Sequence, residues 1–251
     1  ARGCDWARLL AAVRQMACGR SCGQGAVAVR TPVQATALRS PCKIVNTTRL
    51  SIRKATATTH ASRIEQPKGF VSSLRQVGGL EIETAEGGIE YPMSMASSPT
   101  KAWIEFGARV ASGSPWKRAF GALVPGDAVE IDGPYGHFVL DENRDAVFLA
   151  GGIGITPLKG MMEYMTDKKL ATRGALLYGN RTEEEIAFRA DLNSLVAENP
   201  RLSIAHSLSR ALPSWTGRRG RVDATLASET AAGWDRPTFY ICRLPAMGEA
   251  M

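Results

Sequence analysis

The chain has 251 residues, 44% of them hydrophobic, and a formal net charge of +7. This length suffices for two ordinary domains, and no apolar run is as long as a membrane span. The charge is uneven, because residues 1–64 hold eleven Lys and Arg but one acid, Asp5, whereas residues 65–251 hold 20 Lys and Arg and 23 acids. The positive charge therefore belongs to the first part of the chain and is not evidence for nucleic-acid binding.

Residues 1–40 are rich in Ala, Arg, Gly and Ser, and residues 9–16 can form one short amphipathic helix. An Arg-rich, acid-poor segment of this kind resembles an organelle transit peptide. A disordered tail or a translated non-coding stretch would have the same composition. We therefore expect a leader over residues 1–40 and a plastid or mitochondrial protein, with the cytoplasm as the alternative.

The five cysteines do not form a recognisable ligand set. Four of them, Cys4, Cys18, Cys22 and Cys42, lie in or next to the leader, and the fifth is Cys242. Their spacing matches neither the plant-type iron–sulfur pattern nor a zinc-ribbon pair. We expect no metal site and no disulfide framework.

Between residues 41 and 142 the sequence predicts short strands separated by turns. A helix is expected over residues 114–123, with Ser114 as N-cap and Pro115 at its first position. The glycine-rich stretch 67–90 is expected to be mostly loop. Strands are predicted over residues 43–53, 61–65, 102–110 and 128–131, and turns over 125–127 and 133–136. This rhythm predicts a small antiparallel β-barrel.

After Asp145 the pattern changes to strands that alternate with helices. Strands are predicted over residues 147–150, 174–179, 202–208 and 238–242, and helices over 157–168, 184–198, 223–231 and from Pro245 onward. This alternation predicts a parallel α/β sheet over residues 143–251. Ligands of such sheets bind beyond the carboxyl ends of the strands.

The junction at residues 147–157 combines a buried strand, a glycine cluster and a helix start. Gly151, Gly152 and Gly154 allow a tight turn, and we expect Thr156 as N-cap with Pro157 at the first helical position. Free N–H groups there would suit a dinucleotide pyrophosphate. The spacing is not the usual G-x-G-x-x-G of Rossmann folds, so a plain strand–helix connector is the alternative.

Five patches, in this order along the chain, resemble the ferredoxin-NADP reductase superfamily. They are residues 91–99, 125–138, 150–157 and 178–188, and Cys242 with residues 245–247. The resemblance implies a flavin-binding barrel over residues 41–142 and an NAD(P)-binding domain over residues 143–251. It implies a flavin-dependent oxidoreductase that uses FAD, or FMN, together with NADPH or NADH.

In this family the segment that matches residues 91–99 holds the flavin. The resemblance places Tyr91 where the family has an Arg for the flavin phosphate, and Met93 where it has an aromatic residue on the flavin ring. Ser94 is retained and would lie near flavin N5, which makes it a candidate catalytic residue. Met93 can still cover a ring through its sulfur, and Tyr91 is the alternative stacking residue.

The resemblance also assigns the surroundings of the flavin. Ser114 begins the helix that faces the flavin pyrophosphate in the family, where Lys117 and Arg118 add positive charge. Gly133 and Gly136 would shape a barrel turn and leave room for the cofactor.

In the second domain the resemblance assigns Gly151, Gly152, Gly154 and Thr156 to the pyrophosphate loop of the nicotinamide cofactor. Arg181, at the end of the second strand, falls where family members meet the adenosine ribose. Ser209 and Arg210 end the third strand, and a planar guanidinium suits a 2′-phosphate. We therefore favour NADPH over NADH.

Cys242 ends the last predicted strand, where the family has a Cys-Gly pair beside the nicotinamide. It is the second candidate catalytic residue, although Arg243 stands in place of the glycine. A buried, inert cysteine is the alternative.

Hydride transfer between a nicotinamide and a flavin needs little acid–base chemistry, because the cofactors carry it. The three histidines fit this, since none has a visible metal or triad partner, and His137 is expected to be structural. Trp116 and Trp215 are expected to be packing residues. The electron acceptor would be separate: a quinone, a ferric chelate, a ferredoxin or an oxygenase component. We expect no nucleic-acid partner and no membrane span.

Two alternatives stay open from the sequence. The first is a degenerate or truncated family member that binds nucleotide or a partner without turnover, favoured by the changes at Tyr91, Met93 and Arg243. The second is an electron-transfer subunit of a larger complex.

Overall fold

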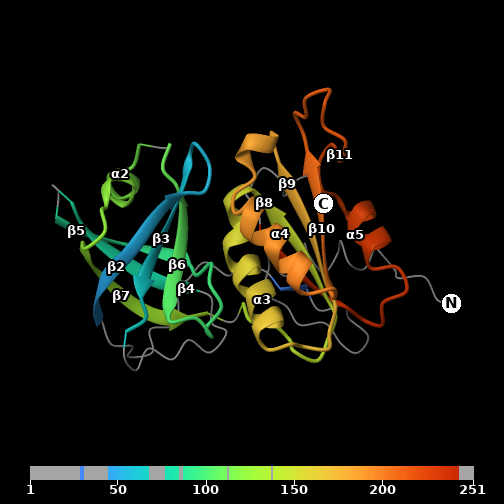
Figure 1. Ribbon diagram of the computed structural model, residues 1–251, viewed down its shortest axis with the longest axis horizontal. Coiled ribbons are helices and arrows are strands. Elements are labelled where there is room, and N and C mark those ends of the chain that lie inside the picture. Colours follow the sequence, from blue (N-terminus) through green and yellow to red (C-terminus); the bar gives the residue numbers. More distant parts are fainter. Residues whose placement is uncertain are drawn as a thin grey trace, which may run out of the picture.

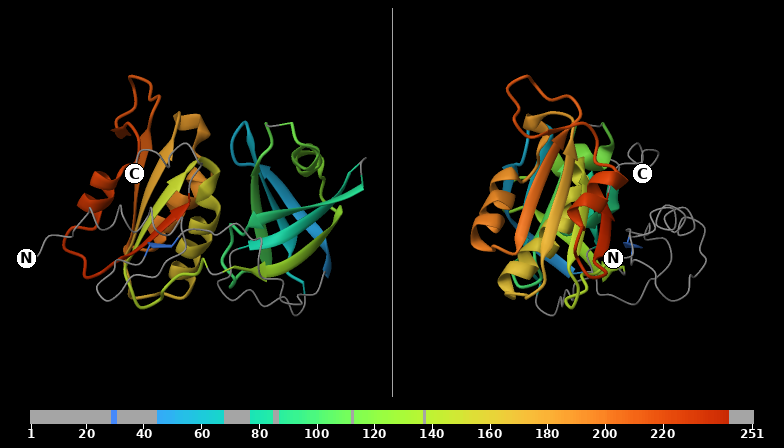
Figure 2. Two further views of the ribbon diagram at one scale, coloured as in Figure 1. Left: turned by 180° about the vertical axis from the view of Figure 1, so that it is seen from behind. Right: turned by 90° about the vertical axis from the view of Figure 1, so that its right-hand side faces the viewer.

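The computed structural model describes residues 29–30, 45–67, 77–84, 87–111, 113–136 and 138–242. Two six-stranded sheets make up the two halves of the molecule, which lie side by side (Figure 1; Figure 2, left). The first sheet is antiparallel and barrel-like, and the second is parallel and flanked by helices. The predicted fold class, a small antiparallel barrel followed by a parallel-sheet nucleotide-binding domain, is confirmed.

The barrel sheet has the strand order β5-β4-β7-β2-β3-β6. An isolated bridge between Met95 and Phe106 joins the end of β5 to β6, so the first and last strands of this order meet. Helix α2 (Pro115–Ala122) packs on the barrel through its buried side chains Trp116 and Phe120. The strands are β2 (Val45–Lys54), β3 (Thr59–Glu65), β4 (Val77–Thr84), β5 (Gly87–Ser94), β6 (Trp103–Arg109) and β7 (Ala128–Tyr135).

Two expectations for the barrel are wrong. The stretch 67–90 was expected to be mostly loop, but residues 77–84 pair with residues 87–94 as a regular antiparallel hairpin. The strand signal there is short, because only residues 80–83 alternate between apolar and acidic side chains and glycine pairs flank them. A turn was expected at 133–136, but β7 continues to Tyr135, with Gly133 at a φ of 138°. Glycine allows that conformation without a steric cost.

The second sheet is parallel throughout and has the order β1-β12-β8-β9-β10-β11. Its strands are β1 (Val29–Arg30), β8 (Ala146–Gly151), β9 (Gly174–Asn180), β10 (Leu202–Leu208), β11 (Arg218–Arg219) and β12 (Thr238–Cys242). All six residues of β8 are buried, because helices cover both faces of the sheet.

Helices α3 (Ile155–Asp167) and α4 (Arg189–Glu198) cover one face of this sheet, and α5 (Ala224–Thr230) covers the other (Figure 2, right). Alternate strand residues supply the two cores: Phe148 and Leu176 pack with α3 and α4, whereas Val147 and Leu177 pack with α5. Helix α3 is the helix of this half that lies nearest the barrel (Figure 1).

In the second half, two features differ from the prediction, and some predicted features lie outside the described residues. The helix predicted over 184–198 begins only at Arg189, since residues 183–185 form the short turn η2 (Glu183–Glu185) and Phe188 adopts a left-handed conformation. Strand β1 lies in the expected leader and pairs with Phe239 and Tyr240. His137, Arg243 and the helix expected from Pro245 lie outside the described residues.

Candidate functional site

The glycine cluster forms a tight connection between β8 and α3. Strand β8 ends at Gly151, a single turn η1 (Gly152–Gly154) follows, and α3 starts at Ile155. The expectation that Thr156 caps this helix is wrong, because Gly154 is the N-cap residue and Thr156 Oγ1 donates to the Ile153 carbonyl at 3.1 Å. Gly154 has no side chain that could cap α3, but the Ile155 N–H already donates to the Gly152 and Ile153 carbonyls and Pro157 has no N–H. An anion here would therefore be favoured mainly by the glycine-rich turn at the positive end of the helix dipole.

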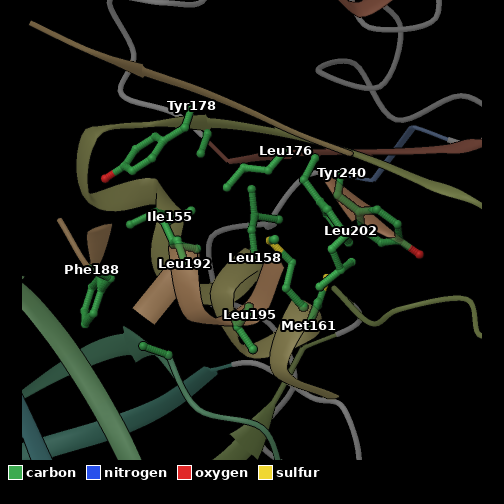
Figure 3. Packing of buried hydrophobic residues seen from close by; sticks show 14 of the residues in the cluster. Ile155, Leu158, Met161, Leu176, Tyr178, Phe188, Leu192, Leu195, Leu202 and Tyr240 are labelled. Carbon is green, nitrogen blue, oxygen red and sulfur yellow. The ribbon is translucent and has the colours of Figure 1, made fainter. Parts of the chain in front are cut away.

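Tyr178 fixes the shape of this loop. Its hydroxyl donates to the Gly152 carbonyl at 2.9 Å, and its ring is fully buried next to Ile155 in the core of this half (Figure 3). Burial raises the pKa of Tyr178, so the hydroxyl stays protonated and keeps its role as a donor. The sequence places Tyr178 at a strand end, but nothing local predicts that it bonds to the loop of the neighbouring strand.

The ends of β9 and β10 bring two predicted arginines together. The backbone N–H of Arg210 donates to the Arg181 carbonyl at 2.8 Å, and that of Ser209 donates to the Asn180 carbonyl at 3.0 Å. Arg181, Ser209 and Arg210 are all exposed. Within the part of the chain that the structure describes, neither guanidinium has a hydrogen bond or ion pair, so both remain available to an anionic ligand.

A third arginine at this edge, Arg219, has a structural role instead. Its guanidinium donates to four backbone carbonyls of the preceding loop, those of Ala211, Leu212, Pro213 and Trp215, at 2.8–3.1 Å. Trp215 closes the same loop by donating from Nε1 to the Arg218 carbonyl at 3.0 Å, which confirms it as a packing residue. Arg219 therefore shapes the loop and has few donors left for a ligand.

Cys242 is the last residue of β12 and pairs in register with Ala150, one residue before the glycine cluster. It therefore lies at the same edge of the sheet as the candidate pyrophosphate loop. Its side chain is half-buried, and burial raises the pKa of the thiol to about 11. The thiol is thus neutral near pH 7 and is suited to pack against a ring rather than to act as a nucleophile.

On the barrel side, the three residues of the flavin motif have different surroundings. Met93 is 7% exposed and packs in the barrel core, so little of its surface is open to a ligand. Tyr91 is 43% exposed, and its ring stacks on Trp116 with a centroid distance of 5.0 Å. Ser94, at the end of β5, is partly buried. The exposed aromatic surface at this motif therefore comes from Tyr91.

The start of α2 lies beside this motif. Ser114 is the N-cap and its hydroxyl accepts from the Lys117 N–H at 3.3 Å, with Pro115 at the first helical position, as predicted. Trp116, buried in the barrel, donates from Nε1 to the Leu80 carbonyl at 3.0 Å, which confirms its packing role. Gly136 has a φ of 93°, a backbone conformation that glycine adopts without steric cost. An exposed ring beside the positive end of a helix dipole fits a flavin with a phosphate group.

The two halves touch directly between these sites. A Cβ atom on Gly107 of β6 would lie 2.9 Å from Phe188 Cζ and 3.0 Å from Thr156 Cγ2. Figure 3 shows Phe188 at the edge of the core cluster that faces the barrel. Phe188 has a φ of 59°, an unusual conformation for a bulky residue that is often found at functional sites. The sequence gives no signal for this contact.

No helix in the described ranges is long and apolar enough to cross a membrane. In the same ranges, no group of three or more His, Cys, Asp or Glu side chains is placed to hold a metal ion.

Comparison with known proteins gives the family. Residues 148–251 match the model of the oxidoreductase NAD-binding domain. The chain is 30% identical over 188 residues to ferredoxin–NADP reductase B of Sorangium cellulosum, which covers 72% of this chain and 77% of that protein. It is 34% identical over 155 residues to the NADPH nitrate reductase of Emericella nidulans, covering 55% of this chain but only 18% of that protein.

A solved structure agrees with the fold. The ferredoxin NADP+ reductase of Neisseria gonorrhoeae, with bound FAD and NADP, superposes with a TM-score of 0.70 at 21% identity, over 83% of this chain and 88% of that one. Together these matches favour a working reductase over the degenerate alternative. The chain belongs to the ferredoxin-NADP reductase superfamily and is an NAD(P)H-dependent flavoprotein oxidoreductase that uses FAD and passes electrons to a separate acceptor.

Proposed function

We propose that this reductase takes its hydride from NADPH in preference to NADH. The observation that carries the proposal is the pair Arg181 and Arg210, exposed side by side at the ends of β9 and β10, with no side-chain partner among the described residues. A guanidinium binds phosphate oxygens bidentately, and NADPH has a 2′-phosphate that NADH lacks.

The acidic residues that follow β9 support the same preference. A reductase that selects NADH needs a free carboxylate for the ribose 2′-hydroxyl. Glu183 is ion-paired with Arg189, and Glu185 is ion-paired with Arg109 at 3.3 Å. Two of the three acids in this turn are therefore engaged with cations from α4 and from the barrel.

Bound FAD supplies the hydride-accepting and electron-passing chemistry of the reaction. The chain's own residues bind and orient the two cofactors. The glycine-rich loop between β8 and α3, which Tyr178 fixes, would hold the pyrophosphate of the coenzyme. Cys242, neutral and at the same edge, would pack beside the nicotinamide. Tyr91, Ser94 and the start of α2 would hold the flavin.

For the acceptor we propose a ferredoxin-type protein. The relative of which the chain spans 77% is a ferredoxin–NADP reductase. The nitrate reductase match spans only 18% of that protein and carries little information about its acceptor. Titration of the reduced protein with a ferredoxin, a quinone and a ferric chelate tests this. A ferredoxin that is reduced no faster than the two small acceptors would contradict it.

The donor preference is tested by anaerobic reduction of the bound flavin with NADPH and NADH in wild type and in Arg210→Leu. We expect Arg210→Leu to lower kcat/KM for NADPH by about 10- to 100-fold, the value of a charge-assisted phosphate contact, and to leave NADH nearly unchanged. Arg201→Leu is the matched control, because Arg201 is exposed at the opposite end of β10. Equal use of both coenzymes by wild type would contradict the proposal.

We also propose, from the composition of residues 1–40, that the protein is imported into a plastid or mitochondrion. Strand β1 limits this leader, because cleavage after residue 28 or earlier would keep the pairing of Val29 and Arg30 with β12. A fusion of residues 1–40 to a fluorescent protein should enter an organelle. Uniform cytoplasmic fluorescence would contradict the proposal.

A further inference from the structure

Six charged side chains gather where the barrel meets the parallel-sheet half. We call them the interface charge cluster. Three come from the barrel strands and three from the helices of the other half, and the positive and negative charges are equal in number. The members are Arg53, Arg63, Glu105, Lys159, Glu163 and Asp191.

Lys159 is the centre of this cluster. Its side chain is fully buried, and Nζ donates to Glu105 Oε2 at 2.9 Å, to Glu163 Oε1 at 2.5 Å and to the Ala96 carbonyl at 3.0 Å. A lysine ammonium has three donors, so every one of them is used. The Phe188 ring lies 5.4 Å from Nζ and covers it further.

Glu105 carries the second buried charge and links the cluster across the barrel. Its side chain is 1% exposed, and Oε1 accepts from Arg53 and Arg63 at 3.1 Å each. Burial alone would raise the pKa of the Glu105 carboxyl, but Lys159, Arg53 and Arg63 outweigh burial and hold it below its ordinary value. Arg53 also donates to Asp191 Oδ1 at 2.9 Å, which reaches α4.

The cluster joins the two places where the cofactors bind. Lys159 lies three residues after Thr156, one turn into the helix whose start forms the pyrophosphate loop. Its bond to the Ala96 carbonyl, and the bond from the Ser98 N–H to Glu163 Oε2 at 2.9 Å, end on the segment that directly follows Ser94. The flavin motif and the nucleotide loop are therefore connected by a short path of directional bonds.

The chemistry of the cluster points to geometry rather than to stability. Buried ion pairs lose so much hydration that well-packed apolar residues often serve stability equally well. Hydrogen bonds with fixed donors and acceptors do specify one arrangement. We propose that Lys159 is a positioning residue that holds the start of α3 and the flavin motif at one separation, so that the nicotinamide and flavin rings meet in the reactive geometry.

The test is Lys159→Met, which keeps an unbranched side chain and removes the charge. We expect the limiting rate of flavin reduction to fall by about 10- to 100-fold, since small misplacements in a near-attack geometry have effects of this size. The dissociation constants for FAD and NADPH should change by less than about threefold, because Lys159 is fully buried and its three donors bind protein acceptors, which leaves none for a ligand. The change in the flavin absorbance spectrum on adding NADP+ should also shrink.

Lys101→Met is the matched control. Lys101 pairs with Asp167 at 2.9 Å and so connects the same segment to the same helix, but both side chains are partly exposed. We expect this variant to react like wild type, because exposed pairs contribute little. The loss in Lys159→Met should be the same with NADPH and with NADH, so this result is independent of the proposed coenzyme preference.

An unchanged limiting rate in Lys159→Met would overturn the proposal. So would a rate that falls only in proportion to lost FAD or NADPH binding, or an equal fall in Lys101→Met. If Lys159→Met does not fold, Glu163→Gln provides the second test, because the Glu163 side chain is 14% exposed and tolerates loss of its charge more easily. A fall in limiting rate with intact cofactor binding supports the proposal, and wild-type rates overturn it.

Discussion

The two halves of the molecule build their ligand surfaces from different parts of the chain. In the parallel-sheet half the candidate pyrophosphate surface is backbone, the loop at Gly151 to Gly154, and only the proposed 2′-phosphate contact comes from side chains, those of Arg181 and Arg210. In the barrel half the ligand surface is mainly side chain, with the ring of Tyr91 and the hydroxyl of Ser94 next to a buried Met93.

This difference determines what a change of residue can do in each half. A backbone surface depends on its glycines and on the hydrogen bonds that fix the loop, rather than on which side chains line it. A side-chain surface depends on which residues point outward, so one replacement changes the ligand contact itself. Both surfaces act together only while the two halves stay in contact. We therefore expect the largest effects on stability from substitutions at that contact.

The largest expected effect is that of Glu105→Gln, which removes the carboxylate that both halves share. We expect the free energy of unfolding to fall by about 3–5 kcal/mol, because Lys159 and two arginines lose a buried charge partner. Chemical denaturation measures it. Glu83→Gln, on the exposed side of β4, is the control, and an equal loss there would show that the shared position has no special weight.

Acid pH should weaken the same contact. The native pKa of Glu105 lies below its ordinary value of 4.5, so the unfolded chain binds the proton more tightly. The stabilisation is therefore complete above about pH 4.5 and is lost as the pH falls through the native pKa. Between about pH 3 and pH 6, the Tm should therefore depend more steeply on pH in wild type than in Glu105→Gln. Parallel profiles would contradict this.

Gly107→Ala is expected to have the next largest effect. The added methyl would lie 2.9 Å from Phe188 Cζ and 3.0 Å from Thr156 Cγ2, which forces the halves apart at a cost of about 1–3 kcal/mol. Gly113→Ala is the matched control, since its Cβ would meet only Arg118 Nη1 at 3.7 Å. A lower Tm in the first variant and an unchanged Tm in the second are expected. Similar Tm values in the two variants would mean that the contact between the halves adjusts to the methyl group at little cost.

Tyr91→Arg sharpens the comparison on the barrel side. It places a guanidinium where the family has one, and we expect FAD to bind about tenfold more tightly, as one charge-assisted contact to phosphate allows. Fluorescence titration of FAD measures the affinity. Tyr91→Phe keeps the ring stacked on Trp116 and should bind FAD like wild type. Unchanged affinity in Tyr91→Arg would place the flavin phosphate away from this strand.

Tyr178→Phe is the smallest change and probes the backbone surface. It removes the bond to the Gly152 carbonyl at 2.9 Å and is expected to cost about 1 kcal/mol in stability. KM for NADPH should rise while FAD affinity stays the same, because only the loop loses support. A change in FAD affinity instead would contradict the assignment of this loop to the nicotinamide coenzyme.

Much of the sheet half is predictable from the sequence, and less of the barrel. Long apolar runs bounded by glycine and polar residues mark β8, β9 and β10, because strands buried on both faces leave a continuous pattern. The hairpin β4–β5 is missed because its glycines and outward acids resemble a loop. The cap of α3 is missed by two residues, since Thr156 and Gly154 are both plausible helix starts in local sequence.

The interface charge cluster could not be predicted from local sequence at all. A lysine within a helix ordinarily predicts a solvent-facing position, and its partner Glu105 lies 54 residues earlier in the chain. The left-handed conformation of Phe188 is equally hard to predict, because this residue contacts Gly107, which lies in the other half of the molecule. Both features depend on how the halves meet, which no pattern within either half contains.

Strand β1 has a consequence for the handling of the protein. It pairs with Phe239 and Tyr240 on the outer side of β12, a strand that also contains Ile241. At the opposite edge of the sheet, β11 is short and carries Arg218 and Arg219, which discourage pairing with another molecule. A protein shortened to residues 41–251 lacks β1 and presents an apolar strand with free backbone groups. Such a product is expected to self-associate through β12, strand against strand, where the longer chain stays monodisperse.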